Sequence, residues 1–135
     1  MPDIKELKDI GWALNKEENV WIAYDPALEF NKMGFIYAKL TPGQELKIHY
    51  HERLENGDEV FIFPYEGKIE LKTIEEDKIK IDPYTIEPDN PISIAFKDKE
   101  SHGIKNTGDK DIIFLALYAP SFVPGEVKHP NIHNL

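Results

Sequence analysis

The sequence predicts one all-β domain, built as a sandwich or a barrel. Three observations support this fold class. Short runs rich in β-branched and aromatic residues recur from Val20 onward. Turn-forming pairs such as Asp25-Pro26 and Asn56-Gly57 separate these runs. The chain has 135 residues, the length of one domain, and its 41% hydrophobic content is that of a globular protein.

Only one segment has helical spacing. Ile4, Leu7 and Ile10 recur on one face, and Gly11 is a stop signal, so a short N-terminal helical segment is expected from Ile4 to Leu14. The strands are expected at Val20–Tyr24, Gly34–Leu40, Glu45–Glu52, Glu59–Pro64, Lys68–Ile74, Lys78–Ile81, Ile92–Phe96, Gly103–Asn106 and Asp111–Tyr118. A turn is predicted at Asp82-Pro83, after the sixth strand.

Composition also distinguishes the last predicted strand from the C-terminal tail. Ile112 to Leu117 is apolar without alternation, which indicates a strand covered on both faces. The proline-containing tail, residues 120–135, is expected to be irregular. Residues 1–135 are therefore predicted to form a single domain with a core at about 20–119.

Composition also excludes several classes of partner and site. The net charge is −9 without a basic block, so neither nucleic acid nor an anionic membrane surface is an expected partner. The absence of cysteine rules out disulfides and thiolate metal sites. The charged N-terminus shows no signal peptide, and no stretch is apolar enough to span a membrane, so a cytoplasmic location is expected.

The histidines are the most informative residues. His49 and His51 are separated by one residue, so on a strand both project from the same face. Two imidazoles on one strand can grip a metal ion together. His102 is a candidate third ligand, although a lone histidine in a strand is more often a hydrogen-bonded polar residue. His129 and His133 lie in the tail and are expected to be solvated.

The carboxylate of the site depends on the connection between two strands. If Glu55-Asn56-Gly57 form a three-residue hairpin loop, His51 pairs with Phe61 and His49 with Phe63, and Glu59 shares the histidine face beside both phenylalanines. If Asn56-Gly57 form a two-residue turn, the register slips by one residue. Asp58 or Glu55 then becomes the candidate. The first register is preferred because it places a charge beside a cation.

Two motifs carry a resemblance to a known family. The segment Gly43-Gln-Glu-Leu-Lys-Ile-His49-Tyr-His51, followed by Glu59 and Gly67, resembles the first motif of the cupin superfamily. His102-Gly-Ile-Lys-Asn106 resembles the end of the second. There are three departures. Seven residues lie between His51 and Glu59, more than in the family motif, and seven rather than six lie between Glu59 and Gly67. Lys97-Asp98-Lys99 replaces the usual Pro-x-Gly.

The resemblance implies a small antiparallel jelly-roll β-barrel. It also implies that one divalent transition metal ion, Fe, Mn, Ni or Zn, binds inside the barrel through His49, His51, Glu59 and His102. Pairing as a homodimer and binding of a small-molecule ligand are further implications.

Function is less constrained than fold. The first hypothesis is a metal-dependent enzyme acting on a small polar metabolite, as an isomerase or epimerase or as a dioxygenase. Glu59 would be the catalytic residue, a ligand that can detach and act as a base. The alternative is a non-catalytic module that binds or senses a small molecule. A metal-free structural barrel is the third hypothesis.

Overall fold

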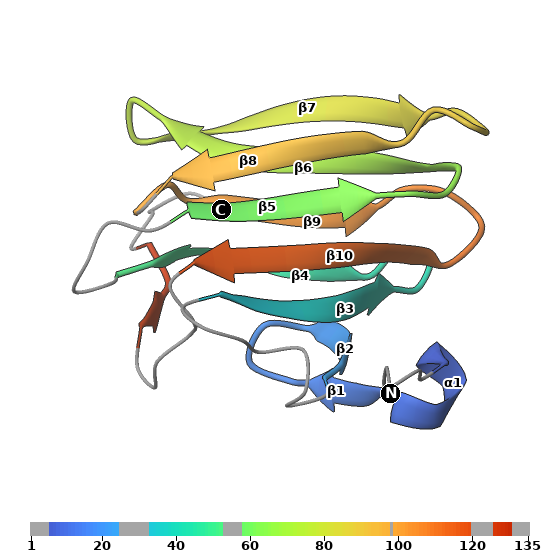
Figure 1. Ribbon diagram of the computed structural model, residues 1–135. Helices are drawn as coiled ribbons and strands as arrows, with labels where there is room; N and C mark the ends of the chain where they lie inside the picture. Colours follow the sequence, from blue (N-terminus) through green and yellow to red (C-terminus); the bar gives the residue numbers. More distant parts are fainter. Residues whose placement is uncertain (1–5, 25–32, 53–57, 98, 120–125, 131–135) are drawn as a thin grey trace.

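The computed structural model describes residues 6–24, 33–52, 58–97, 99–119 and 126–130. Two antiparallel sheets lie face to face, with one short helix near the N-terminus (Figure 1). The elements are α1 (Leu7–Ile10), β1 (Ala13–Asn15), β2 (Val20–Ala23), β3 (Gly34–Leu40), β4 (Glu45–His51), β5 (Asp58–Phe63), β6 (Gly67–Glu75), β7 (Lys78–Ile86), β8 (Ile92–Lys97), β9 (His102–Asn106), β10 (Ile112–Ala119) and β11 (Val127–Lys128).

The two sheets have the strand orders β1-β2-β3-β10-β5-β8 and β11-β4-β9-β6-β7. Every strand pair in them is antiparallel. The predicted all-β jelly-roll fold is therefore confirmed. Within the described residues no ladder joins one sheet to the other, so the barrel is not closed.

The core lies between the sheets. Along β10, Ile112, Phe114, Ala116 and Tyr118 are buried, while the residues between them are half-buried. This alternation places one face of β10 in the core and leaves the other partly covered, where full cover on both faces was expected. The remaining core comes mainly from β3, β5 and β8 of this sheet and from β4, β6 and β9 of the facing sheet.

The N-terminal segment differs from the prediction. The helix has a single turn, Leu7–Ile10, and Glu6 provides no side-chain cap. Gly11 does end it, with a φ of +82° that glycine adopts without strain. Beyond Gly11, Ala13–Asn15 pair with β2 as a strand. A turn this short has little intrinsic stability, so sheet pairing prevails over helical spacing.

Two further predictions were wrong in part. No turn occurs at Asp82-Pro83, because β7 continues through Pro83 to Ile86. Proline lacks a backbone donor, which an edge strand tolerates, and β7 is the edge of its sheet. The tail is not irregular throughout, since Val127–Lys128 pair with His51 and Tyr50 of β4.

Candidate metal centre

The two sheets bring four predicted site residues together. His49 and His51 lie on β4, and His102 lies opposite His49 on the neighbouring strand β9. Glu59 lies on β5 in the facing sheet. All four side chains are buried. One ligand atom from each lies within 4.8 Å of the others, so the group has the size of a single metal site.

A β-bulge sets the direction of the β4 side chains. Between Leu46 and His49, β4 has one residue more than the facing segment of β9. An extra residue reverses the inward and outward alternation, so Leu46 and both histidines are all buried. Gly103 lies against this bulge, where a Cβ would come within 2.9 Å of the Leu46 carbonyl oxygen. The missing side chain at Gly103 therefore allows the bulge to form.

Each imidazole is held through its Nδ1 atom. His49 Nδ1 lies 2.8 Å from the Lys47 carbonyl oxygen, and His102 Nδ1 lies 2.9 Å from that of Glu100. His51 Nδ1 lies 2.9 Å from a carboxylate oxygen of Glu126. These oxygens accept hydrogen bonds, so each Nδ1 carries a proton and donates. In a neutral ring this leaves the Nε2 lone pair for a metal ion.

The contacts of Glu59 favour a cation at the centre of the group. Glu59 Oε1 lies 2.8 Å from His102 Nε2 and 3.3 Å from His51 Nε2. Because both rings donate through Nδ1, a neutral ring turns a lone pair toward a carboxylate oxygen. The arrangement is stable only when positive charge lies between these atoms, either a second proton on an imidazole or a metal ion. The donor set of three nitrogens and one carboxylate fits a divalent transition metal.

Burial and neighbouring groups set the protonation states. Burial, helped by the nearby His102, lowers the pKa of His49 to about 3, so this ring is neutral near pH 7. Burial alone would raise the pKa of Glu59. Contacts with His102 and His51 outweigh burial and hold the pKa of Glu59 below its ordinary value, provided that their Nε2 atoms carry a second proton. A metal ion at this position would supply the same positive charge. A neutral imidazole and an ionised carboxylate are the forms that bind metals.

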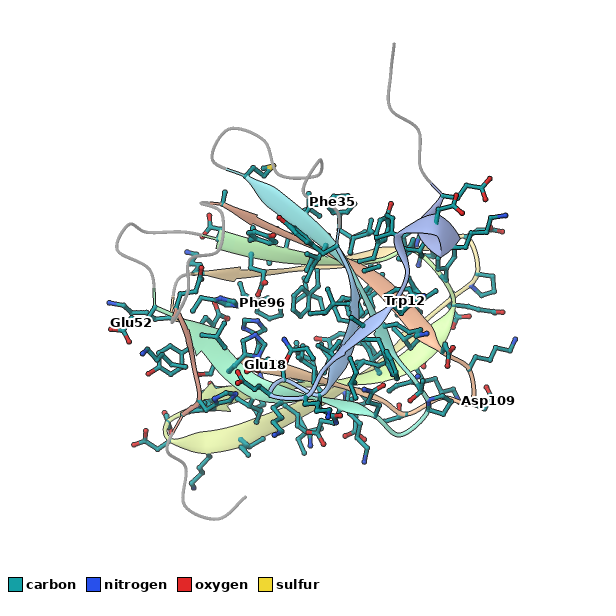
Figure 2. The ribbon with its side chains drawn as sticks, turned by 90° about the horizontal axis from the view of Figure 1, so that it is seen from below. Trp12, Glu18, Phe35, Glu52, Phe96 and Asp109 are labelled. Atoms are coloured by element: carbon teal, nitrogen blue, oxygen red, sulfur yellow. The ribbon has the colours of Figure 1, made fainter. Side chains whose placement is uncertain are left out.

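A second layer of side chains surrounds the four. Phe96 stacks on His102 with ring centroids 4.0 Å apart and planes at 9°, which fixes the tilt of that ring. Glu18, between β1 and β2, has Oε2 at 3.5 Å from His49 Nδ1 and Oε1 at 2.8 Å from His129 Nε2. In Figure 2 Glu18 and Phe96 lie toward the interior, whereas Glu52 lies at the outside.

A cavity of about 320 Å³ opens beside the four residues. His49, His51 and Glu59 form part of its wall, and Glu18 and Asn15 supply further polar groups. Most of the wall is apolar and includes Val20, Ile22, Ile36, Leu46, Phe61 and Phe114. Among the described residues that line it, none is a lysine or an arginine.

The geometry corrects the sequence argument for Glu59. The predicted β4–β5 hairpin does not exist, because β4 and β5 lie in different sheets. Glu59 faces the histidines across the interior and is not a cross-strand neighbour. Asp58 lies at the exposed start of β5, and Glu55 lies outside the described residues. Phe61 lines the cavity as expected, but Phe63 is buried against Phe114 in the core.

Comparison with known proteins gives the fold. No protein-family model matches the sequence, and no curated protein matches it. Several solved structures do. A cupin 2 conserved barrel domain protein from Salinispora arenicola shares 15% identity, with a TM-score of 0.66 over 88% of this chain and 89% of that one. The fold is that of the cupins.

Two further cupin-like structures are similar over nearly their whole length. A predicted oxalate decarboxylase from Thermotoga maritima is 23% identical, with a TM-score of 0.63 over 88% of this chain and 100% of that one. The polyketide cyclase RemF from Streptomyces resistomycificus is 15% identical, with a TM-score of 0.68 over 99% of this chain and 89% of that one. At these identities the likeness concerns the cupin fold alone.

Asn106 of the second cupin-like motif has a structural position. Its side-chain amide donates to the carbonyl oxygens of Leu40 and Lys110, at 2.9 and 2.8 Å, and its Oδ1 accepts from the Gly108 amide. These bonds tie the β9–β10 turn to the end of β3. Asn106 thus supports the strand that carries His102.

Sequence reasoning missed Glu18 and Glu126. His129, predicted to be solvated, is half-exposed and paired with Glu18, while His133 lies outside the described residues. None of the helices in the described part of the chain has the length and apolar character to cross a bilayer.

Proposed function

We propose that this protein is a metal-dependent enzyme acting on a small molecule. In this proposal His49, His51, His102 and Glu59 bind one divalent transition metal ion. The observation that carries it is the contact of one carboxylate oxygen of Glu59 with two imidazoles that already donate through Nδ1. Three nitrogens and one oxygen suit Fe(II), Mn(II), Ni(II) or Zn(II).

The bound ion would act as a Lewis acid for an oxygen of the substrate and, if it is iron or manganese, could also serve dioxygen chemistry. The side chains of the protein supply the remaining functions. Each of the three imidazoles supplies one ring nitrogen to the cluster. Glu59 is the proposed catalytic residue, because its carboxylate can serve as a ligand and, once detached from a metal ion, as the acceptor of a substrate proton.

The cavity narrows the substrate class. Three of the site residues, His49, His51 and Glu59, contribute polar groups to its wall, and most of the remaining wall is apolar. A substrate that fits both parts has an oxygen donor at one end and an apolar body. Phosphorylated substrates are disfavoured, because the described wall offers no guanidinium or ammonium group for a phosphate. The small polar metabolite expected from sequence thus becomes a molecule with one polar end.

The second candidate function is a non-catalytic module that binds or senses a small molecule. It is supported by the mainly apolar wall, which suits capture as well as reaction. Both functions require the ligand to fill the same cavity. The two functions differ only in whether the bound molecule is converted to a product.

The test uses protein loaded separately with Fe(II), Mn(II), Ni(II) and Zn(II). Compounds with vicinal oxygens and an apolar body are supplied, namely 4-tert-butylcatechol as an oxygenase substrate and the α-hydroxy ketone 2-hydroxy-1-phenyl-1-propanone as an isomerase or epimerase substrate. Oxalate and glucose 6-phosphate serve as polar comparisons. Dioxygen consumption detects an oxygenase, and solvent deuterium incorporation at carbon detects an isomerase or epimerase. We expect turnover of an apolar compound that Glu59→Gln abolishes. Binding without turnover across a wide panel would establish the binding module instead.

Homodimer formation and a cytoplasmic location remain predictions. Light scattering tests the former, since a monomer has a mass of 15.6 kDa and a dimer has twice that mass.

A further inference from the structure

One of the three site imidazoles is held in a different way from the other two. His49 and His102 each donate to a carbonyl oxygen two residues earlier in their own segments. His51 donates to Glu126, which is 75 residues further along the chain. The acceptor for His51 is therefore a side-chain carboxyl group from the C-terminal segment.

Glu126 is fixed in this position. Its side chain is almost fully buried, and its carbonyl oxygen accepts from the Glu52 amide at 2.7 Å. The next residue, Val127, pairs with His51 in the β4–β11 ladder. Backbone pairing therefore brings the carboxylate to the ring.

The same segment reaches the second imidazole of β4. His129 Nε2 lies 2.8 Å from Glu18 Oε1, and the other oxygen of Glu18 lies 3.5 Å from His49 Nδ1. Residues 126–129 thus contact His51 directly and His49 through Glu18. Val127 and Glu18 also line the cavity, so this segment forms part of its wall.

We propose that residues 126–129 are a clamp of the metal centre, with Glu126 as a positioning residue for His51, and that docking of the clamp is coupled to metal binding. This inference rests on the proposed metal-dependent function. A carboxylate acceptor fixes the Nδ1–H tautomer, orients the ring and increases the basicity of Nε2 toward a metal ion. Thermodynamic linkage then makes the effect reciprocal. The factor by which docking of the clamp raises the affinity for the metal ion equals the factor by which the metal ion raises the docking equilibrium constant.

The first experiment measures affinity for Zn(II) and Co(II) by competition with a chromophoric chelator. Full-length wild type, Glu126→Ala, Glu126→Gln and Lys128→Gln are compared. Lys128 is the matched control because it lies on β11 with an exposed side chain. We expect Glu126→Ala to bind about 10- to 100-fold more weakly. Glu126→Gln, which keeps an acceptor without charge, should lose less, and Lys128→Gln should change less than about two-fold.

Two readouts separate positioning from a general loss of structure. Nitrogen-15 spectra of the imidazoles in the Zn(II) form should show His51 bound through Nε2, with a slowly exchanging Nδ1 proton that Glu126→Ala loses. Hydrogen exchange at the amides of residues 126–129 should slow on addition of Zn(II) in wild type and not in Glu126→Ala. Far-ultraviolet circular dichroism verifies that each variant is folded.

The outcomes distinguish the clamp from the metal site itself. Tight metal binding by wild type with equal affinity in Glu126→Ala would overturn the clamp and leave the proposed function standing. Unchanged amide exchange at residues 126–129 on metal binding would likewise overturn the clamp and leave the proposed function standing. Failure of the wild type to bind either metal would overturn both.

Discussion

Glu59 Oε1 lies 2.8 Å from His102 Nε2, although the two residues belong to strands of opposite sheets. The cluster therefore connects the two layers of an open barrel through its side chains. A metal ion shared by these atoms would join the same layers. Metal binding is thus expected to stabilise the fold as well as to supply chemistry.

Removing the charge of Glu59 should weaken the metal site strongly. Glu59→Gln keeps the shape of the side chain but replaces an anionic ligand by a weak neutral one. We expect a loss of metal affinity above about 100-fold, more than the loss typical of a supporting residue. Asp58→Asn is the matched control, because Asp58 precedes Glu59 and is exposed. Equal losses in both variants would contradict the ligand role of Glu59.

The metal-free protein should lose stability in mild acid. The pKa of His49 is 6.5 in the unfolded reference and about 3 in the folded protein, so between these values the unfolded chain binds more protons. Stability due to neutral His49 is complete above pH 6.5 and falls as the pH decreases toward 3. From pH 7.5 to 5 the expected loss is about 2 kcal/mol. The lowered pKa of Glu59 also makes the folded protein less stable in acid, once the pH falls below the ordinary pKa of a glutamate.

Urea unfolding with EDTA at pH 7.5, 6 and 5 measures this loss. His49→Gln has no titrating imidazole at this position and should show a flatter dependence on pH. A wild type that is equally stable at all three values would show that His49 is not buried as a neutral ring.

A methyl group at Gly103 should disturb the site through the backbone. The Cβ of Gly103→Ala would meet the Leu46 carbonyl oxygen at 2.9 Å and Ile48 Cα at 3.2 Å, so β4 must move away from β9. His49 and His51 follow the bulge that this contact displaces. We expect a loss of about 1–3 kcal/mol in unfolding free energy and weaker metal binding. Lys105→Ala on the same strand should leave metal affinity within about two-fold, and similar losses in both variants would argue against a specific role for the bulge.

Filling the cavity should separate ligand binding from metal binding. Ala116 is buried and lines the cavity. Ala116→Phe would therefore fill part of the cavity while all four candidate metal ligands remain unchanged in the sequence. We expect metal stoichiometry to persist while the affinity for apolar test ligands falls at least about 10-fold. Leu115→Phe, on the opposite face of β10, is the control. Calorimetry with 4-tert-butylcatechol measures both variants, and unchanged binding by Ala116→Phe would exclude this cavity.

Local pattern was sufficient to predict most strands and the shared face of His49 and His51. The relation of β4 to β5 could not be obtained in the same way, because turn residues at Asn56-Gly57 suit a hairpin as well as a connection between sheets. The preference for Glu59 over Asp58 agrees with the observed cluster, but for the wrong reason. It assumed a cross-strand neighbour where the residue lies across the interior.

The supporting carboxylates were beyond sequence reasoning for a different reason. Glu18 and Glu126 are two of 25 acidic residues, and nothing in the pattern around them marks burial. Each comes to an imidazole through pairing that is distant along the chain. For Glu126 the sheet brings together residues that are 75 positions apart. The turn predicted at Pro83 was wrong for a related reason. An edge strand tolerates proline, but the sequence alone does not reveal which strand lies at the edge of the sheet.

Anomalous diffraction from a crystal of the metal-loaded protein tests the metal centre most directly. Data collected on both sides of the absorption edge of the loaded ion, Fe, Mn, Ni or Zn, locate that ion independently of any activity. One anomalous peak is expected between β4, β9 and β5, about 2.0–2.2 Å from a nitrogen of His49, His51 and His102 and from an oxygen of Glu59. A peak elsewhere on the protein, or none at these four side chains in a crystal soaked with each metal, would contradict the proposed centre.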